Sequence, residues 1–118
     1  AGVKEVVMLN LDGYVCECSA DNILMVKNGV LKTPPASAGI LKGITRDTIM
    51  EVARSTGREA FEENITRYDL YTADEVFLCG TGAELIAAIR IDGRVIGTGK
   101  PGPVFKDLLE RFRAMVAS

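Results

Sequence analysis

Three dipeptides constrain the fold of this chain more than any other feature: Asp12-Gly13, Asn28-Gly29 and Asp92-Gly93. Each is typical of a two-residue β-hairpin loop, because a type I′ turn requires positive φ at both of its central positions. Runs of apolar and β-branched residues flank the dipeptides, which predicts strands on both sides. The predicted strands are residues 5–11, 14–19, 22–27, 30–33, 85–91 and 94–96. We therefore expect an antiparallel meander.

Two segments with helical periodicity interrupt these strands. In the first, Ile49, Val52 and Ala53 share one face, Thr45 is predicted to cap the helix, and Gly57 is predicted to end it. The second predicted helix covers residues 103–116, and its apolar stripe is expected to face the core. That stripe consists of Val104, Leu108, Phe112, Met115 and Val116.

The segment between the helices completes the order of elements. Residues 58–65 are a predicted strand, 66–73 a turn or short helix, and 75–79 a buried strand. Helices and strands are grouped rather than strictly alternating, which favours an α+β fold or an irregular α/β pseudo-barrel over a doubly wound sheet. We expect an antiparallel-rich sheet with two main helices, in a single domain formed by residues 1–118.

Composition argues against several classes of function. The chain has no histidine, which removes Ser/His and Cys/His nucleophile pairs and histidine metal sites. Its three cysteines, Cys16, Cys18 and Cys79, are expected to be free thiols, so we expect no metal site. A net charge of −2 without a basic run argues against nucleic acid or a membrane surface as a partner. Without a secretion signal or a membrane-length apolar run, a cytoplasmic protein is expected.

Two glycine-containing segments are candidate anion sites. Residues 39–45 lead into the first predicted helix, whose N-terminal N–H groups lack intrahelical partners and favour phosphate. The alternative is that Thr45 only caps the helix and Gly43 only turns the chain. Gly80-Thr81-Gly82 follows a buried strand and is a second candidate cradle. Neither a dinucleotide fingerprint nor a P-loop is present, because Leu85 and Arg94 occupy required glycine positions.

Glu17 lies in a predicted strand among small and sulfur-containing residues. Its carboxylate would be unusual if that face of the strand were buried, whereas an exposed glutamate on a strand needs no special role. The residues around Glu17 leave both alternatives open.

These signals occur together in the order that one family uses. The matching segments are 14–23, 43–47, 71–84, 91–94 and 99–103, which include GITRD from Gly43 to Asp47 and ADEVFLCGTGAE from Ala73 to Glu84. They resemble the C-terminal part of class IV (fold type IV) aminotransferases. The run Gly80-Thr81-Gly82-Ala83-Glu84 is most similar to the branched-chain amino acid aminotransferases. D-amino acid aminotransferases and aminodeoxychorismate lyases are the alternatives within the class.

The resemblance implies that the chain binds pyridoxal 5′-phosphate. Glu17 would be the catalytic partner of the pyridine nitrogen, and Leu41 would pack on the face of the ring. The N–H groups of Thr81 and Gly82 would receive the substrate carboxylate. The cofactor-binding residues that the resemblance implies are Glu17, Leu41, Gly43, Ile44, Thr45 and Thr81.

The resemblance also implies a larger enzyme. In the family, the Schiff-base lysine and an N-terminal domain precede the region that matches this chain, and Ala1 stands almost at the start of a predicted strand. We therefore expect a C-terminal fragment of a two-domain enzyme, inactive by itself. The full enzyme would be a homodimer that exchanges the amino group of leucine, isoleucine or valine with 2-oxoglutarate.

Some positions depart from the family's usual residues, namely Ala20, Leu24 and Ile86-Ala87. They weaken the substrate assignment more than the cofactor assignment, because none is an implied phosphate ligand. A non-catalytic binding module of the same fold is the alternative from a different class of function.

Overall fold

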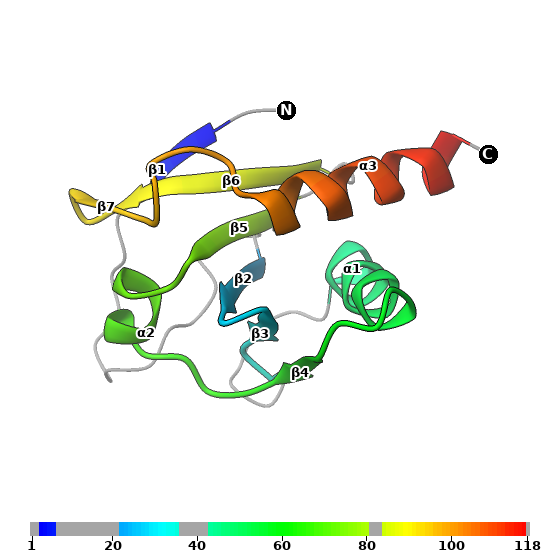
Figure 1. The fold of residues 1–118 in the computed structure, drawn as a ribbon, viewed down its shortest axis with the longest axis horizontal. Helices are drawn as coiled ribbons and strands as arrows, with labels where there is room; N and C mark the ends of the chain where they lie inside the picture. The colour runs from blue at the N-terminus through cyan, green and yellow to red at the C-terminus, as the bar shows by residue number, and fades with distance from the viewer. Residues whose placement is uncertain (1–2, 7–21, 36–42, 81–83, 118) are drawn as a thin grey trace.

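The computed structural model describes residues 3–6, 22–35, 43–80 and 84–117 (Figure 1). The strands in these ranges are β1 (Val3–Val6), β2 (Asn22–Lys27), β3 (Val30–Thr33), β4 (Ala60–Glu62), β5 (Glu75–Gly80), β6 (Glu84–Ile91) and β7 (Arg94–Val95). The helices are α1 (Ile44–Ser55), α2 (Arg67–Tyr71) and α3 (Pro103–Ala117). The expectation of an α+β fold with two main helices is confirmed, with α2 as a short addition.

The strands form one mixed sheet in the order β1-β6-β5-β2-β3-β4, with β7 paired to β6. Antiparallel pairs join β2 to β3, β2 to β5, β5 to β6 and β6 to β7, as the meander predicts. The β1–β6 and β3–β4 pairs are parallel. The second of these was missed in the sequence. Helix α1 connects β3 to β4, and a crossover helix allows neighbouring strands to run in the same direction.

Two of the three predicted hairpin turns fall within the described residues. Asn28 and Gly29 have φ values of 52° and 79°, and Asp92 and Gly93 have 51° and 80°. Positive φ at both central positions confirms the type I′ geometry. The Asp12-Gly13 turn and the predicted strand 14–19 lie outside the described residues, as does most of the predicted strand 5–11.

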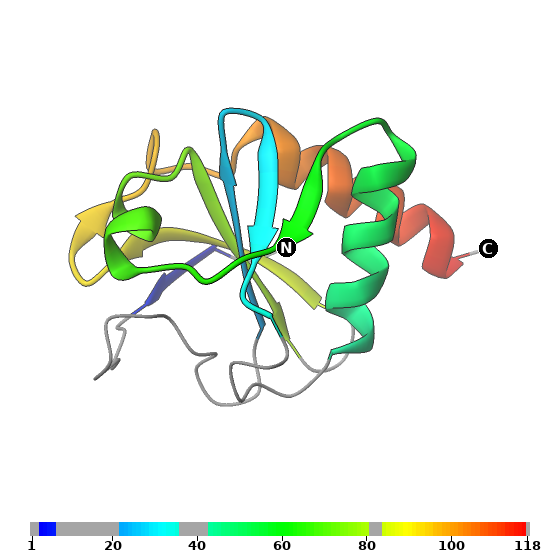
Figure 2. The same ribbon diagram turned by 90° about the horizontal axis from the view of Figure 1, so that it is seen from below.

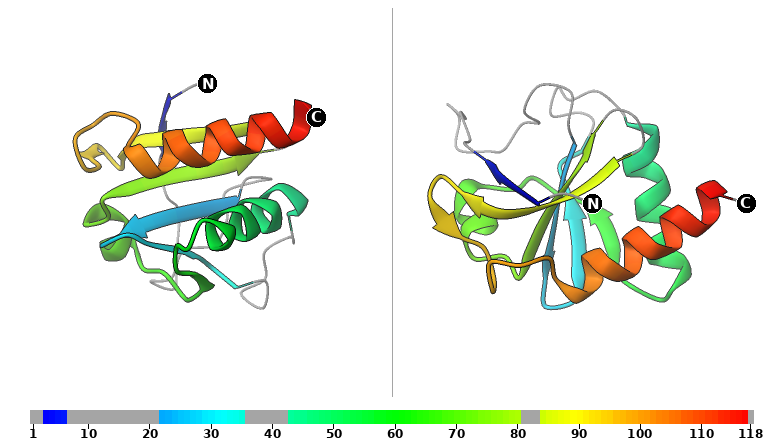
Figure 3. Two further views of the ribbon diagram at one scale, coloured as in Figure 1. Left: turned by 45° about the vertical axis from the view of Figure 1, so that its right-hand side comes forward. Right: turned by 90° about the horizontal axis from the view of Figure 1, so that it is seen from above.

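The central strands are buried on both faces. Alternate residues of β2 enter two separate apolar clusters: Leu24 and Val26 pack on one side, and Ile23 and Met25 on the other. Strands β5 and β6 alternate in the same way. Helices α1 and α3 cover the first face (Figure 3, left), whereas α2 and its neighbouring segments contribute to the second cluster. Strands enclosed in this way are almost continuously apolar.

Several predicted boundaries need correction. Thr45 does not cap α1, because the helix begins one residue earlier at Ile44, with Gly43 as its N-cap. The predicted strand 58–65 is limited to β4, since the residues after Glu62 lead instead into α2. Met115 and Val116 are exposed rather than part of a buried stripe, because the buried residues of α3 extend only to Phe112.

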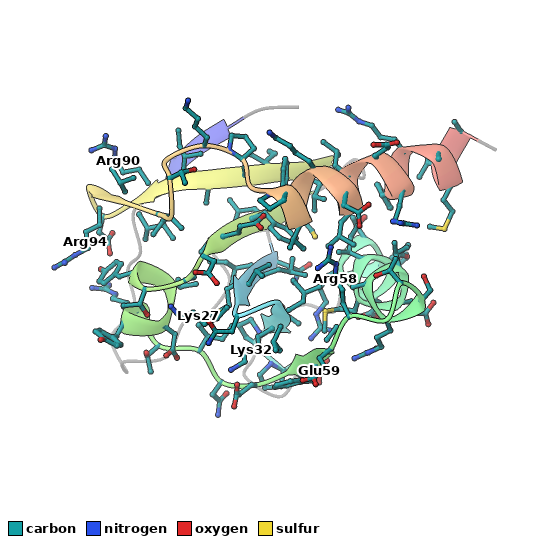
Figure 4. The ribbon with its side chains drawn as sticks, in the orientation of Figure 1. Lys27, Lys32, Arg58, Glu59, Arg90 and Arg94 are labelled. Atoms are coloured by element: carbon teal, nitrogen blue, oxygen red, sulfur yellow. The ribbon has the colours of Figure 1, made fainter. Side chains whose placement is uncertain are left out.

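Two further contacts attach the peripheral elements. Tyr71 at the end of α2 donates a hydrogen bond of 2.5 Å to Asp92 in the β6–β7 turn, and this bond raises the pKa of Tyr71 above its ordinary value. Arg94 lies over the Tyr71 ring, 4.6 Å from its centroid (Figure 4). Arg58, beside α1 and α3 in the same figure, lies 3.6 Å from Asp107.

The carboxylate of Glu75 fixes the start of α3. Glu75 is the first residue of β5 and is only 8% exposed. Its two oxygens accept hydrogen bonds from the N–H groups of Val104, at 3.0 Å, and Phe105, at 2.8 Å. These donors belong to the first helical turn, where no intrahelical acceptor exists and a negative charge is favourable. Gly102 leaves room for the contact, since a Cβ there would lie 2.2 Å from Glu75 Cδ.

Replacement of Glu75 tests this contact. We expect Glu75→Ala to lower the free energy of unfolding by about 2–4 kcal/mol, because two buried N–H groups lose a charged acceptor. Glu75→Gln should cost less, because one acceptor oxygen remains. The matched control is Glu110→Ala on the exposed side of α3, with a change of at most about 0.5 kcal/mol. Urea unfolding measures all three, and equal losses at both positions would contradict the role of Glu75.

Candidate anion-binding site at the start of helix α1

The N-terminus of α1 differs from those of the other two helices. Helix α2 begins with a capping box between Thr66 and Asp69, and the first turn of α3 binds the Glu75 carboxylate. Gly43, the N-cap of α1, supplies no side-chain hydrogen bond. Within the described part of the chain, no acceptor is found for the N–H groups of Ile44, Thr45 and Arg46. A helix end with open donors and a positive dipole binds anions, phosphate in particular.

Two side chains at this turn are available to a ligand. Ile44 is 86% exposed, which is unusual for a large apolar residue in an ordered helix. Thr45 is half-buried, and its hydroxyl makes no hydrogen bond among the described residues. The hydroxyl can therefore add to the backbone donors of the turn. The arrangement supports an anion site better than the alternative in which Thr45 merely caps the helix.

The edge of the sheet brings further segments to this turn. In the β2–β5 pair, Asn22 stands opposite Cys79, one residue before the end of β5 at Gly80. A Cβ built on Gly43 would lie 2.1 Å from Asn22 Oδ1, so Gly43 packs directly on the Asn22 side chain. Figure 2 shows the starts of α1 and β2 and the end of β5 at the same lower edge. Two sequence-predicted anion segments thus converge at one place.

Arg46 ties the first turn of α1 to its surroundings. Its side chain is 5% exposed and donates to Asp47 at 2.6 Å, to Glu62 of β4 at 2.5 Å, and to the carbonyl of Pro34 at 2.9 Å. Burial lowers the pKa of Arg46, but the hydrogen bonds to Asp47 and Glu62 outweigh it and raise the pKa. The guanidinium therefore stays charged. It also neutralises Asp47, the one acidic residue in the first turn of α1, which would otherwise repel an anion.

The same contacts fix the start of the approach loop. The Thr33 hydroxyl donates to the Ile23 carbonyl at 2.7 Å, and the next residue, Pro34, is bound by Arg46. The chain that leads to α1 is thus attached to β2 on one side and to α1 on the other.

The structure locates only some of the predicted site residues. Gly43, Ile44 and Thr45 lie together at the open turn. The predictions for Glu17, Leu41, Thr81 and Gly82 concern positions outside the described residues.

Sequence reasoning missed the roles of Asn22 and Arg46. Arg46 could have been found, because it precedes Ile49, Met50 and Ala53 at helical spacing and thus shares the buried face. A buried asparagine at the start of an apolar strand is a weaker signal.

The comparisons identify the family. The sequence profile of "Amino-transferase class IV" matches residues 1–91. This chain belongs to the class IV aminotransferases. A Methanocaldococcus jannaschii protein assigned as a branched-chain-amino-acid aminotransferase is 51% identical over 113 residues, which cover 96% of this class IV chain and 39% of that protein.

Solved structures agree with this assignment. The branched-chain aminotransferase of the archaeon Thermoproteus uzoniensis, solved with norvaline, has a TM-score of 0.84 and 47% identity and covers 92% of this chain. The branched-chain amino acid aminotransferase from T.th., solved with pyridoxamine 5′-phosphate, has a TM-score of 0.85, 42% identity and the same coverage. This class IV chain spans 36% of each of those chains and corresponds to their C-terminal part. In the described residues, no helix is long and apolar enough to cross a membrane.

The Arg46 contacts generate a testable prediction. We expect Arg46→Lys to lower the free energy of unfolding by about 1–3 kcal/mol, because an ammonium group cannot reach three acceptors with the geometry of a guanidinium. Arg113→Lys, at an exposed position of α3, is the matched control and should change stability by less than about 0.5 kcal/mol. Urea unfolding provides the measurement. An Arg46→Lys chain as stable as the control would show that the network contributes little.

Proposed function

We propose that this chain is the cofactor-binding, C-terminal part of a two-domain branched-chain amino acid aminotransferase. The observation that carries the proposal is the open first turn of α1, formed by the GITRD segment at the edge where β2 and β5 end. The named relatives and their bound ligands support the same conclusion.

The described residues fit the phosphate of pyridoxal 5′-phosphate. The first turn of α1 offers backbone donors without acceptors and one hydroxyl, all at the positive end of a helix of 12 residues. Gly43 leaves the end of the helix without a capping side chain that would compete with the phosphate. Ile44 and Thr45 would therefore bind the phosphate. We assign Thr81 as a further ligand on the strength of the family resemblance.

The remaining site residues would act on the ring and on the substrate. When bound, pyridoxal phosphate supplies a ring that withdraws electrons from the substrate Cα. Glu17 would hold a proton on the pyridine nitrogen through a charge-assisted hydrogen bond, worth roughly 1.5–3 kcal/mol. Leu41 would pack against the ring and exclude water. The N–H groups of Thr81 and Gly82 would orient the substrate by its carboxylate.

Binding of the cofactor is the first test. We expect pyridoxal phosphate to raise the melting temperature of the chain in a saturable way. Thr45→Ala should weaken binding about 10- to 100-fold, the loss of one hydrogen bond to a charged group. Thr48→Ala, one turn further along α1, is the matched control, because its hydroxyl bonds to the Ile44 carbonyl within the helix. No saturable shift, or full affinity in Thr45→Ala, would refute the site.

Turnover is the second test. With leucine and 2-oxoglutarate, we expect the chain alone to give no activity above a cofactor-only control. The reason is that none of its lysines matches the family lysine; they are Lys4, Lys27, Lys32, Lys42, Lys100 and Lys106. Activity of the isolated chain would show that another group replaces that lysine. In an enzyme that contains this chain, comparing leucine, D-alanine and aminodeoxychorismate as substrates would separate the branched-chain assignment from its two alternatives.

A further inference from the structure

Asn22 is a buried polar residue in an otherwise apolar strand. It is 5% exposed and begins β2, whose next four residues are apolar and buried. Burying a carboxamide in place of an apolar side chain costs free energy unless the group is used in the structure. No role in the proposed site has so far been given to Asn22, although it lies at the edge of the sheet where that site is formed.

The contact between Asn22 and Gly43 is closer than any side chain at position 43 would allow. A Cβ on Gly43 would lie 2.1 Å from Oδ1 and 3.1 Å from Cγ of Asn22. Gly43 has φ −96° and ψ 129°, a conformation that every residue adopts easily. Glycine is therefore required here by space and not by backbone conformation. The carboxamide of Asn22 rests against the backbone of the α1 N-cap.

This contact sets the position of the open donors. The N–H groups of Ile44 and Thr45 directly follow Gly43, and Cys79, the partner of Asn22 across the sheet, stands two residues before Thr81. In the sequence, Asn22 also follows Glu17 by five residues. We propose that Asn22 is a positioning residue for the cofactor phosphate, acting through its packing against Gly43 to hold the first turn of α1 at the edge of β2 and β5. The inference rests on the proposed function.

The test compares two ligands that differ only in the phosphate. We expect Asn22→Ala to weaken binding of pyridoxal phosphate to the chain about tenfold, and to leave binding of pyridoxal, which lacks the phosphate, within about twofold. Asn64→Ala, an exposed asparagine, is the matched control and should change neither. Equal weakening of both ligands, or unchanged affinity for pyridoxal phosphate, would overturn the proposal.

A second variant guards against a simple loss of folding. Gly43→Ala keeps Asn22 but introduces the clash, so it should also weaken pyridoxal phosphate selectively. In the double variant the clash is relieved, and the loss should be smaller than the sum of the two single losses. Additive losses would show that the two residues act independently and would overturn the proposal.

Amide hydrogen exchange in the ligand-free chain separates this inference from the proposed function. We expect Asn22→Ala, but not Asn64→Ala, to speed exchange at residues 44–47. If the unmodified chain binds no pyridoxal phosphate but this difference is found, the proposed function fails while the hold of Asn22 on α1 stands. If neither binding nor the difference is found, both fail.

Discussion

The antiparallel pairing of β2 with β5 holds the whole arrangement together. Both strands are buried on both faces, so their backbone N–H and C=O groups must be satisfied by each other and by their neighbours in the sheet. The two ends of the pair position different helices. At one end Asn22 and Cys79 meet the start of α1, and at the other Val26 and Glu75 pair where Glu75 binds the start of α3. The positions of both helices therefore follow from one strand pair.

The two helix N-termini illustrate how similar groups acquire different tasks. The first turn of α3 is occupied by a carboxylate of the same chain, which stabilises the fold. The first turn of α1 has no such acceptor among the described residues, although Asp47 lies close enough to interfere. Arg46 binds Asp47 and thereby removes the competing negative charge, while it also ties α1 to β4 and to Pro34. A buried ion cluster of this type keeps a helix end open for an external anion.

Local signals predicted much of the fold and part of the site. The turns at Asn28-Gly29 and Asp92-Gly93 were predictable because only a few dipeptides adopt positive φ twice in succession. The open turn at Gly43 was predictable from the glycine, the threonine and the helical periodicity that follows. The extent of β4 was not, because a strand of three residues depends on its partner β3 rather than on its own composition. The role of Asn22 also depends on a neighbour, Gly43, that lies 21 residues away.

The sequence by itself determined the hairpin turns, the two long helices, the buried strands and the membership of the class IV aminotransferases, since each of these rests on residues close together in the chain. Only the tertiary structure decided which helix N-terminus is closed and which is open. That distinction depends on side chains brought from distant segments: Glu75 to α3, and Asn22 and Glu62 to the start of α1. Packing fixes such contacts, and no local preference of the backbone encodes them.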